Sequence, residues 1–132
     1  MKSLFSAISI AILYLATTSF QLENSLTGTW EYRGGIYGYQ KKGAAKGVVI
    51  HRVYADGKYE GFITVKGKTQ KYEAGTFTMH DKNYIETQTF SNGATAVKGK
   101  AIHYTFAIKN NTITFKGTVN KSPVEEYWKK MK

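Results

Sequence analysis

Three charged side chains, Arg52, Glu86 and Glu126, fall with Gln88 on a face of the expected strands that is otherwise mostly aromatic and aliphatic. A guanidinium can anchor an anionic group, and two carboxylates held at a suitable separation can perform acid–base or glycosidase chemistry. Burying an unpaired charge is costly, so two interpretations remain open. In one, Arg52 pairs with Glu86 or Glu126, and nearby tyrosines complete a closed network. In the other, these groups line a water-accessible cavity and orient the polar group of a ligand.

Several other kinds of chemistry are missing from the sequence. The chain has no cysteine, which excludes thiolate metal sites and a thiol nucleophile. His51, His80 and His103 lie far apart, and neither an H-E-x-x-H nor a G-x-S-x-G motif occurs. The glycine-rich residues 34–38 precede no helical pattern, so they do not form a phosphate loop. We therefore expect no metal, no cofactor and no catalytic residue of these types.

Tight turns determine which side chains share a face with Arg52. An Asp-Gly turn at 56–57 places Arg52 opposite Gly61. An Asn-Asn turn at 110–111 likewise fixes which residues face each other in the hairpin that it joins. Alternation along these and the neighbouring strands then gives one inward-facing set. We predict that a ligand would be lined by this set: Arg52, Tyr54, Tyr59, Tyr84, Glu86, Tyr104, Phe106, Phe115, Glu126 and Trp128.

Short runs rich in Val, Ile, Thr, Tyr and Phe, separated by turn residues, predict eight strands. They cover residues 26–33, 47–54, 58–65, 69–79, 84–91, 98–108, 112–119 and 124–131. Joined in order by hairpins, they make an all-β, antiparallel up-and-down meander, and closing it into a barrel removes both sheet edges. A switch of the apolar phase at Gly75 predicts a β-bulge. The long glycine-rich stretch 34–46 is expected to be a mobile loop at a barrel mouth.

The charge balance is strongly basic. Among 132 residues, 19 Lys and Arg face 9 Asp and Glu, which gives a formal net charge of +10. Such an excess favours anionic partners without choosing among them. Proteins that bind single-stranded nucleic acid interleave basic residues with exposed aromatic ones, whereas the aromatic residues here register inward. We therefore expect no nucleic-acid partner.

The first twenty residues are typical of a secretory signal peptide. A short basic start is followed by an uncharged apolar run at 4–14 and by small residues at 16–19. The run is shorter than the roughly 20 apolar residues that a transmembrane helix needs, so no stable membrane anchor is expected. No cysteine is available for a lipoprotein anchor. We predict a signal peptide over 1–20, a single domain over 21–132, and a secreted or periplasmic location.

Four short motifs carry a family resemblance. They are a G-x-W on the first strand, a G-T-aromatic and a Tyr-x-Glu-Thr in mid-chain, and a Glu-x-Trp-Lys-basic at the end, at 28–30, 75–77, 84–87 and 126–130. With the eight-strand meander, they make the mature chain resemble the lipocalins, within the calycin-type barrels. The resemblance is greater to the short lipocalin-like domains of uncharacterised secreted bacterial proteins.

The resemblance implies roles for the two ends of the meander. In lipocalins the G-x-W tryptophan closes one end of the barrel, and a basic residue of the last strand packs over it. By position, Gly28, Trp30 and Lys130 would form this closure. Lysine replaces the usual arginine and lacks its planar stacking surface.

The function expected is binding of a small, largely apolar ligand, with Arg52 available to anchor an anionic group. A second hypothesis is a structural or interaction module with a filled barrel, whose basic exterior engages a surface polymer. A third, less favoured, is an isomerase, cyclase or hydrolase that uses Glu86 or Glu126, since barrels of this kind host isomerases and cyclases. No oligomeric state follows from the sequence.

Overall fold

The structure is a computed structural model that describes residues 22, 25–93 and 97–131, and its named elements are all strands. The predicted signal peptide, 1–20, lies outside the described residues. The strands are β1 (Gly28–Tyr37), β2 (Gln40–Gly43), β3 (Val48–Ala55), β4 (Lys58–Val65), β5 (Lys68–His80), β6 (Asn83–Ser91), β7 (Ala101–Lys109), β8 (Thr112–Val119) and β9 (Ser122–Lys130).

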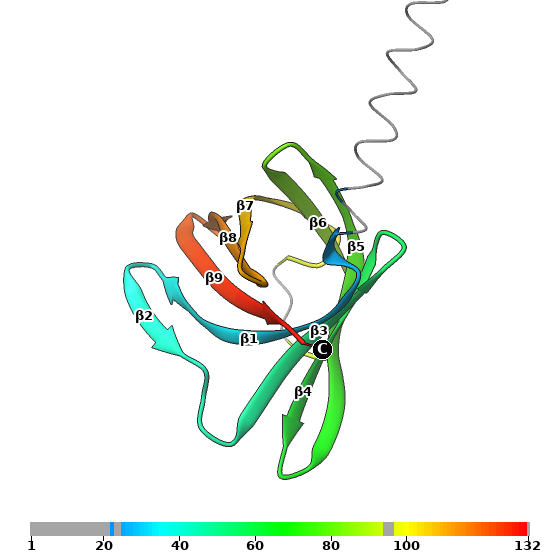
Figure 1. Cartoon of the computed structure of the whole chain (residues 1–132), viewed down its shortest axis with the longest axis vertical. Coiled ribbons are helices and arrows are strands. Elements are labelled where there is room, and N and C mark those ends of the chain that lie inside the picture. Colours follow the sequence, from blue (N-terminus) through cyan, green and yellow to red (C-terminus); the bar gives the residue numbers. More distant parts are fainter. Residues whose placement is uncertain (1–21, 23–24, 94–96, 132) are drawn as a thin grey trace, which may run out of the picture.

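Neighbouring strands pair in the order β2-β1-β3-β4-β5-β6-β7-β8-β9, and β1 also pairs with β9. The additional pairing closes a barrel of eight strands, and β2 stands outside the ring (Figure 1). Closure satisfies the backbone groups that an open sheet would leave at its edges. The predicted all-β up-and-down meander barrel is confirmed.

The segment 34–46 is not the loop that its glycines suggested. β1 continues to Tyr37, the chain turns at Gly38 and Tyr39, and β2 returns along β1 from Tyr37↔Gln40 to Gly34↔Gly43. Gly38 and Tyr39 have φ values of 56° and 82°, the left-handed backbone that a two-residue hairpin turn requires. Tyrosine seldom adopts this conformation, so the sequence did not signal the turn.

Most hairpin registers match the sequence pattern. Arg52 faces Gly61 across the turn at 56–57, and Phe106 faces Phe115 across the turn at 110–111. The predicted bulge is present between Ala74 and Gly75. The strand predicted at 98–108 instead begins at Ala101.

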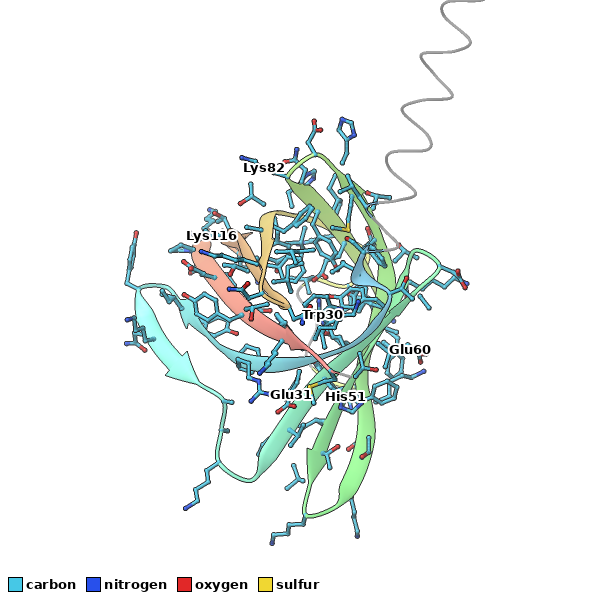
Figure 2. The ribbon with its side chains drawn as sticks, viewed as in Figure 1. Trp30, Glu31, His51, Glu60, Lys82 and Lys116 are labelled. Carbon is cyan, nitrogen blue, oxygen red and sulfur yellow. The ribbon has the colours of Figure 1, made fainter. Side chains whose placement is uncertain are left out.

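One end of the barrel is packed with aromatic and aliphatic side chains, and we call it the closed end. The turns at 56–57, 81–82 and 110–111 lie there, because alternate connections of a meander share an end. Figure 2 shows Trp30 inside the ring of strands, whereas Glu60 and Lys82 lie on its outside. The buried apolar residues are Leu26, Trp30, Tyr54, Tyr59, Phe77, Met79, Tyr84, Ile113, Phe115 and Trp128.

The opposite end, which we call the mouth, carries the remaining described connections: 38–39, 44–47, 66–67, 92–93 with 97–100, and 120–121. Here β4 and β5 stay paired as far as Val65↔Lys68, beyond the last β5–β6 pair, Glu73↔Ser91. The β3–β4–β5 sheet therefore projects past the ring at the lower part of the view (Figure 1).

Candidate functional site

Arg52 is the centre of a buried charge network between the closed end and the mouth. Its Nε and Nη2 donate to Oε1 of Glu73 at 2.8 and 2.5 Å, and its Nη1 donates to Oε2 of Glu86 at 3.0 Å. The same Nη1 lies 3.3 Å from the Tyr54 hydroxyl. The guanidinium carbon lies 4.6 Å from the ring centre of Tyr59. A guanidinium offers five N–H donors, so this arrangement uses most of its capacity.

Glu73 is a member of this network that sequence reasoning missed. A bulge between Gly61 and Phe62 shifts the β4–β5 register and places Glu73 opposite Gly61, itself opposite Arg52. A Cβ on Gly61 would come within 2.7 Å of the Glu73 Cγ. The missing side chain at Gly61 therefore makes the space through which Glu73 reaches Arg52. A glycine registered opposite an inward arginine was the available sequence signal.

The electrostatics of the network follow from its burial. Burial raises the pKa of Glu86, because desolvation penalises the carboxylate, and Arg52 only partly opposes this rise. Burial also works to lower the pKa of Arg52, but Glu73 and Glu86 outweigh it and hold that pKa well above its usual value. Arg52 is therefore always charged. The Tyr84 hydroxyl donates to Oε2 of Glu86 at 2.8 Å.

Glu126 belongs to a second polar cluster and does not pair with Arg52. Its Oε2 accepts from Trp128 Nε1 at 2.9 Å, and its Oε1 accepts from the Tyr37 hydroxyl at 3.2 Å. The hydroxyls of Tyr32 and Tyr37 are 2.7 Å apart. Burial raises the pKa of Tyr37, as does the adjacent Glu126, so this phenol stays neutral. Tyr37 comes from the stretch that the sequence assigned to a loop.

Two cavities lie at the mouth side of these clusters and share Tyr37 and Glu126 as lining residues. The larger, about 240 Å³, is bordered by the Arg52 network and by Gln88, Ile102 and Val124. The smaller, about 190 Å³, lies against Tyr32, Ile50, Tyr72 and Trp128. Within the described structure, the buried Oε1 of Gln88 has no hydrogen-bond partner.

The residues predicted to line a ligand site separate into two groups. Arg52, Glu86, Tyr104, Glu126 and Trp128 border the mouth cavities. The others line neither cavity and instead belong to or pack against the core: Tyr54, Tyr59, Tyr84, Phe106 and Phe115. The barrel is therefore filled at its closed half and hollow at its mouth half.

The larger cavity adjoins an opening in the barrel wall. β7 and β8 are paired from Lys109↔Thr112 to Tyr104↔Gly117. Beyond that pair, a hollow of about 480 Å³ lies between Ala101–His103 and Thr118–Val119. Its lining includes Ile102, Tyr104 and Val119, which also border the larger cavity.

The residues assigned to barrel closure lie at the closed end. Trp30 is 1% exposed, and its Nε1 donates to the backbone oxygen of Leu26 at 2.8 Å. Lys130 pairs with Trp30 across β1 and β9, and its Nζ lies 5.8 Å from the centre of the indole. Gly28 has a φ of 125°, and a Cβ there would lie 3.5 Å from the Lys130 Cε.

In the part of the chain that the structure describes, the His, Asp and Glu side chains form no group of three that could hold a metal ion. No helix in the same part is long and apolar enough to cross a bilayer.

Comparison with known proteins identifies the fold. No family model matches the chain, and no curated protein sequence matches it. An uncharacterized protein from Bacteroides eggerthii superposes with a TM-score of 0.59 at 12% identity, covering 80% of this chain and 99% of that protein. A lipocalin-like protein from Bacteroides uniformis gives 0.59 at 9% identity, covering 80% and 98%. The chain therefore has a lipocalin-like fold, as the sequence motifs indicated.

Proposed function

We propose that this lipocalin-like barrel binds a small, largely apolar molecule in the two mouth cavities, and that the polar group of this molecule is a protonated amine. The observation that carries the proposal is the charge of the lining. Glu73, Glu86 and Glu126 border the cavities, and Arg52 is the one cationic side chain among the described lining residues. Apolar walls with a few converging polar groups are typical of small-molecule sites.

An anionic ligand group fits this site poorly. Arg52 was the expected anchor for it, but that guanidinium is already bound by two carboxylates. The Glu126 side chain accepts from the neutral donors Tyr37 and Trp128, and within the described structure Gln88 contributes a buried oxygen without a hydrogen-bond partner. A ligand ammonium supplies three N–H donors and a positive charge, and the Glu126 and Gln88 oxygens can accept from those donors.

The hypothesis of a filled barrel describes the closed half of the molecule but leaves the mouth cavities unused. Ligand binding uses both halves, because the packed core holds the strands in place and the hollow half supplies the residues that line the cavities.

We also propose that the protein works outside the cytoplasm, in a secreted or periplasmic location. The support for this location is the signal-peptide pattern of residues 1–20.

Calorimetric titration with octylamine, octanol and octanoate tests the proposal, because the three probes share one chain and differ in charge. We expect octylamine to bind most tightly and octanoate least. Glu126→Gln keeps the shape of the lining and removes a charge. It should weaken octylamine about tenfold or more, since a hydrogen bond to a charged group is worth about 1.5–3 kcal/mol.

The matched control is Glu60→Gln, which removes a carboxylate from the exposed outer face and should leave all three affinities unchanged. Octanoate binding as tightly as octylamine would contradict the amine assignment while keeping the cavity as the site. Failure of all three probes, together with a native mass spectrum free of copurified small molecules, would contradict ligand binding itself.

A further inference from the structure

The mouth of the barrel is surrounded by lysines. The described ranges that form it, 38–47, 64–71, 91–93, 97–101 and 116–124, contain no Asp or Glu, and Glu125 follows directly after the last of them. Within the described residues, Lys71 pairs with Glu60 and Lys116 with Glu125, and the other mouth lysines have no ion pair. We call these others the rim lysines, and all are exposed: Lys41, Lys42, Lys46, Lys66, Lys68, Lys98, Lys100 and Lys121.

The closed end is different, although it also carries lysines. Two of its three turns carry both signs, since Asp56 precedes Lys58 and Asp81 precedes Lys82, and the third has Lys109 beside it. Of the carboxylates nearest the mouth, Glu125 is paired with Lys116 on the outer face, and those of the Arg52 and Glu126 clusters border the larger cavity inside the barrel. Among the described residues, the surface charges around the entrance that have no ion-pair partner are therefore those of the rim lysines.

Apolar side chains are exposed among the rim lysines. Tyr39, at the tip of the β1–β2 turn, is 89% exposed, and Val65, at the end of the projecting β4, is 41% exposed. Tyr39 also lines a surface hollow of about 290 Å³, together with Ile36, Pro123 and Val124 and with the ion-paired Lys116 and Glu125. The amide of Gly38 donates a 2.9 Å hydrogen bond to the Pro123 oxygen, which ties the β1–β2 turn to the start of β9.

We propose that the mouth docks on an anionic lipid bilayer. Lysines near a membrane surface are attracted to anionic headgroups, and each contributes about a fivefold gain in binding. Tyrosine is suited to the interface, because its ring enters the apolar layer while its hydroxyl stays hydrated. The apolar part of the hollow beside Tyr39, formed by Ile36, Pro123 and Val124, can accept part of an acyl chain. A soluble polyanion would use the lysines but would leave Tyr39, Val65 and this hollow exposed to water.

This inference goes beyond the proposed function and is independent of the ligand. Docking by the mouth would also bring the cavities to the surface into which a largely apolar molecule partitions. The experiment uses the chain from residue 21 onward, which contains every strand of the barrel. It is sedimented with vesicles of phosphatidylcholine alone and with vesicles that also contain phosphatidylglycerol. We expect binding to the anionic vesicles, weakened by added salt.

Two matched triple variants locate the surface. The rim variant Lys41→Glu/Lys42→Glu/Lys121→Glu should lose at least about tenfold in vesicle binding. The closed-end variant Lys58→Glu/Lys82→Glu/Lys109→Glu makes the same change of net charge and should bind far better than the rim variant. Circular dichroism confirms that both are folded. Equal losses in the two variants, or no binding of the unmodified chain, would overturn the proposal.

Tyr39→Ser separates a bilayer from a soluble polyanion. The variant should weaken vesicle binding several-fold and leave heparin binding unchanged. A chain that binds heparin at least as tightly as the anionic vesicles, and whose Tyr39→Ser variant binds both as before, would identify a polyanion as the partner and overturn the lipid assignment.

Discussion

At the residue scale, the interior is organised by one arginine with two acidic partners. Arg52, Glu73 and Glu86 are each about nine-tenths buried or more, so little solvent is available to compensate a missing partner. The attraction within the network mainly offsets the cost of dehydrating three charges. The network mainly fixes the positions of its members, because Arg52 holds the Glu73 and Glu86 carboxylates at the base of the larger cavity.

Arg52→Met tests this balance. We expect a loss of about 3–5 kcal/mol in the free energy of unfolding, because two carboxylates are left buried without a cation. Denaturant melts measure the loss. The triple variant Arg52→Met/Glu73→Leu/Glu86→Leu removes every charge together and should recover most of the stability. A single variant that costs less than about 1 kcal/mol would show that the interior is wet enough to tolerate unpaired carboxylates.

At the element scale, the cavity owes its shape to irregular strands. Bulges occur in the β1–β9, β4–β5 and β5–β6 pairings. Alternation along β5 already puts Glu73 on the same buried face as Phe77 and Met79. The β4–β5 bulge sets the partner of Glu73, which lies opposite Gly61 and within reach of Arg52. The long curved β1 contributes at both ends, with Trp30 in the core and Tyr37 at the mouth.

Gly61→Ala tests whether the β4–β5 bulge serves the charge network. The new Cβ would lie 2.7 Å from the Glu73 Cγ and 3.0 Å from the Tyr72 ring, so the Glu73 side chain must move from Arg52. We expect a loss of about 1–3 kcal/mol in the free energy of unfolding. Gly43→Ala, where a Cβ meets no atom within 4 Å, is the control and should be close to neutral. Equal stabilities of the two variants would contradict this role of Gly61.

At the scale of the whole molecule, packing and charge are divided between the two ends. The closed end carries the core, and the mouth carries the cavities and the rim lysines. Three of the nine acidic residues turn inward at the mouth, so the outer surface is more basic than the net charge of +10 indicates. With the mouth docked on an anionic membrane as proposed, the cavities would face the bilayer. A protonated amine held in that membrane would then reach them directly.

Trp30→Ala probes the closed end, on which the integrity of the barrel depends. Trp30 is 1% exposed and contacts the first and last segments of the barrel through Leu26 and Lys130. Removing a large buried aromatic side chain should lower the free energy of unfolding by about 3–5 kcal/mol. Tyr39→Ala at the exposed tip of the mouth should change it by no more than about 0.5 kcal/mol. Thermal melts that give similar losses for both variants would contradict the division into a packed end and an open end.

The sequence alone determined the strand content, the meander and the face on which Arg52 lies, because alternation and two-residue turns are local properties. It also determined the end motifs of the first and last strands. Only the tertiary structure decided which charges meet. Glu73 reaches Arg52 through one bulge and a glycine on the strand between them, and Tyr37 reaches Glu126 across the closing β1–β9 pair. Such contacts depend on register shifts summed over several strands, and small irregularities in each pairing change them without a local signal.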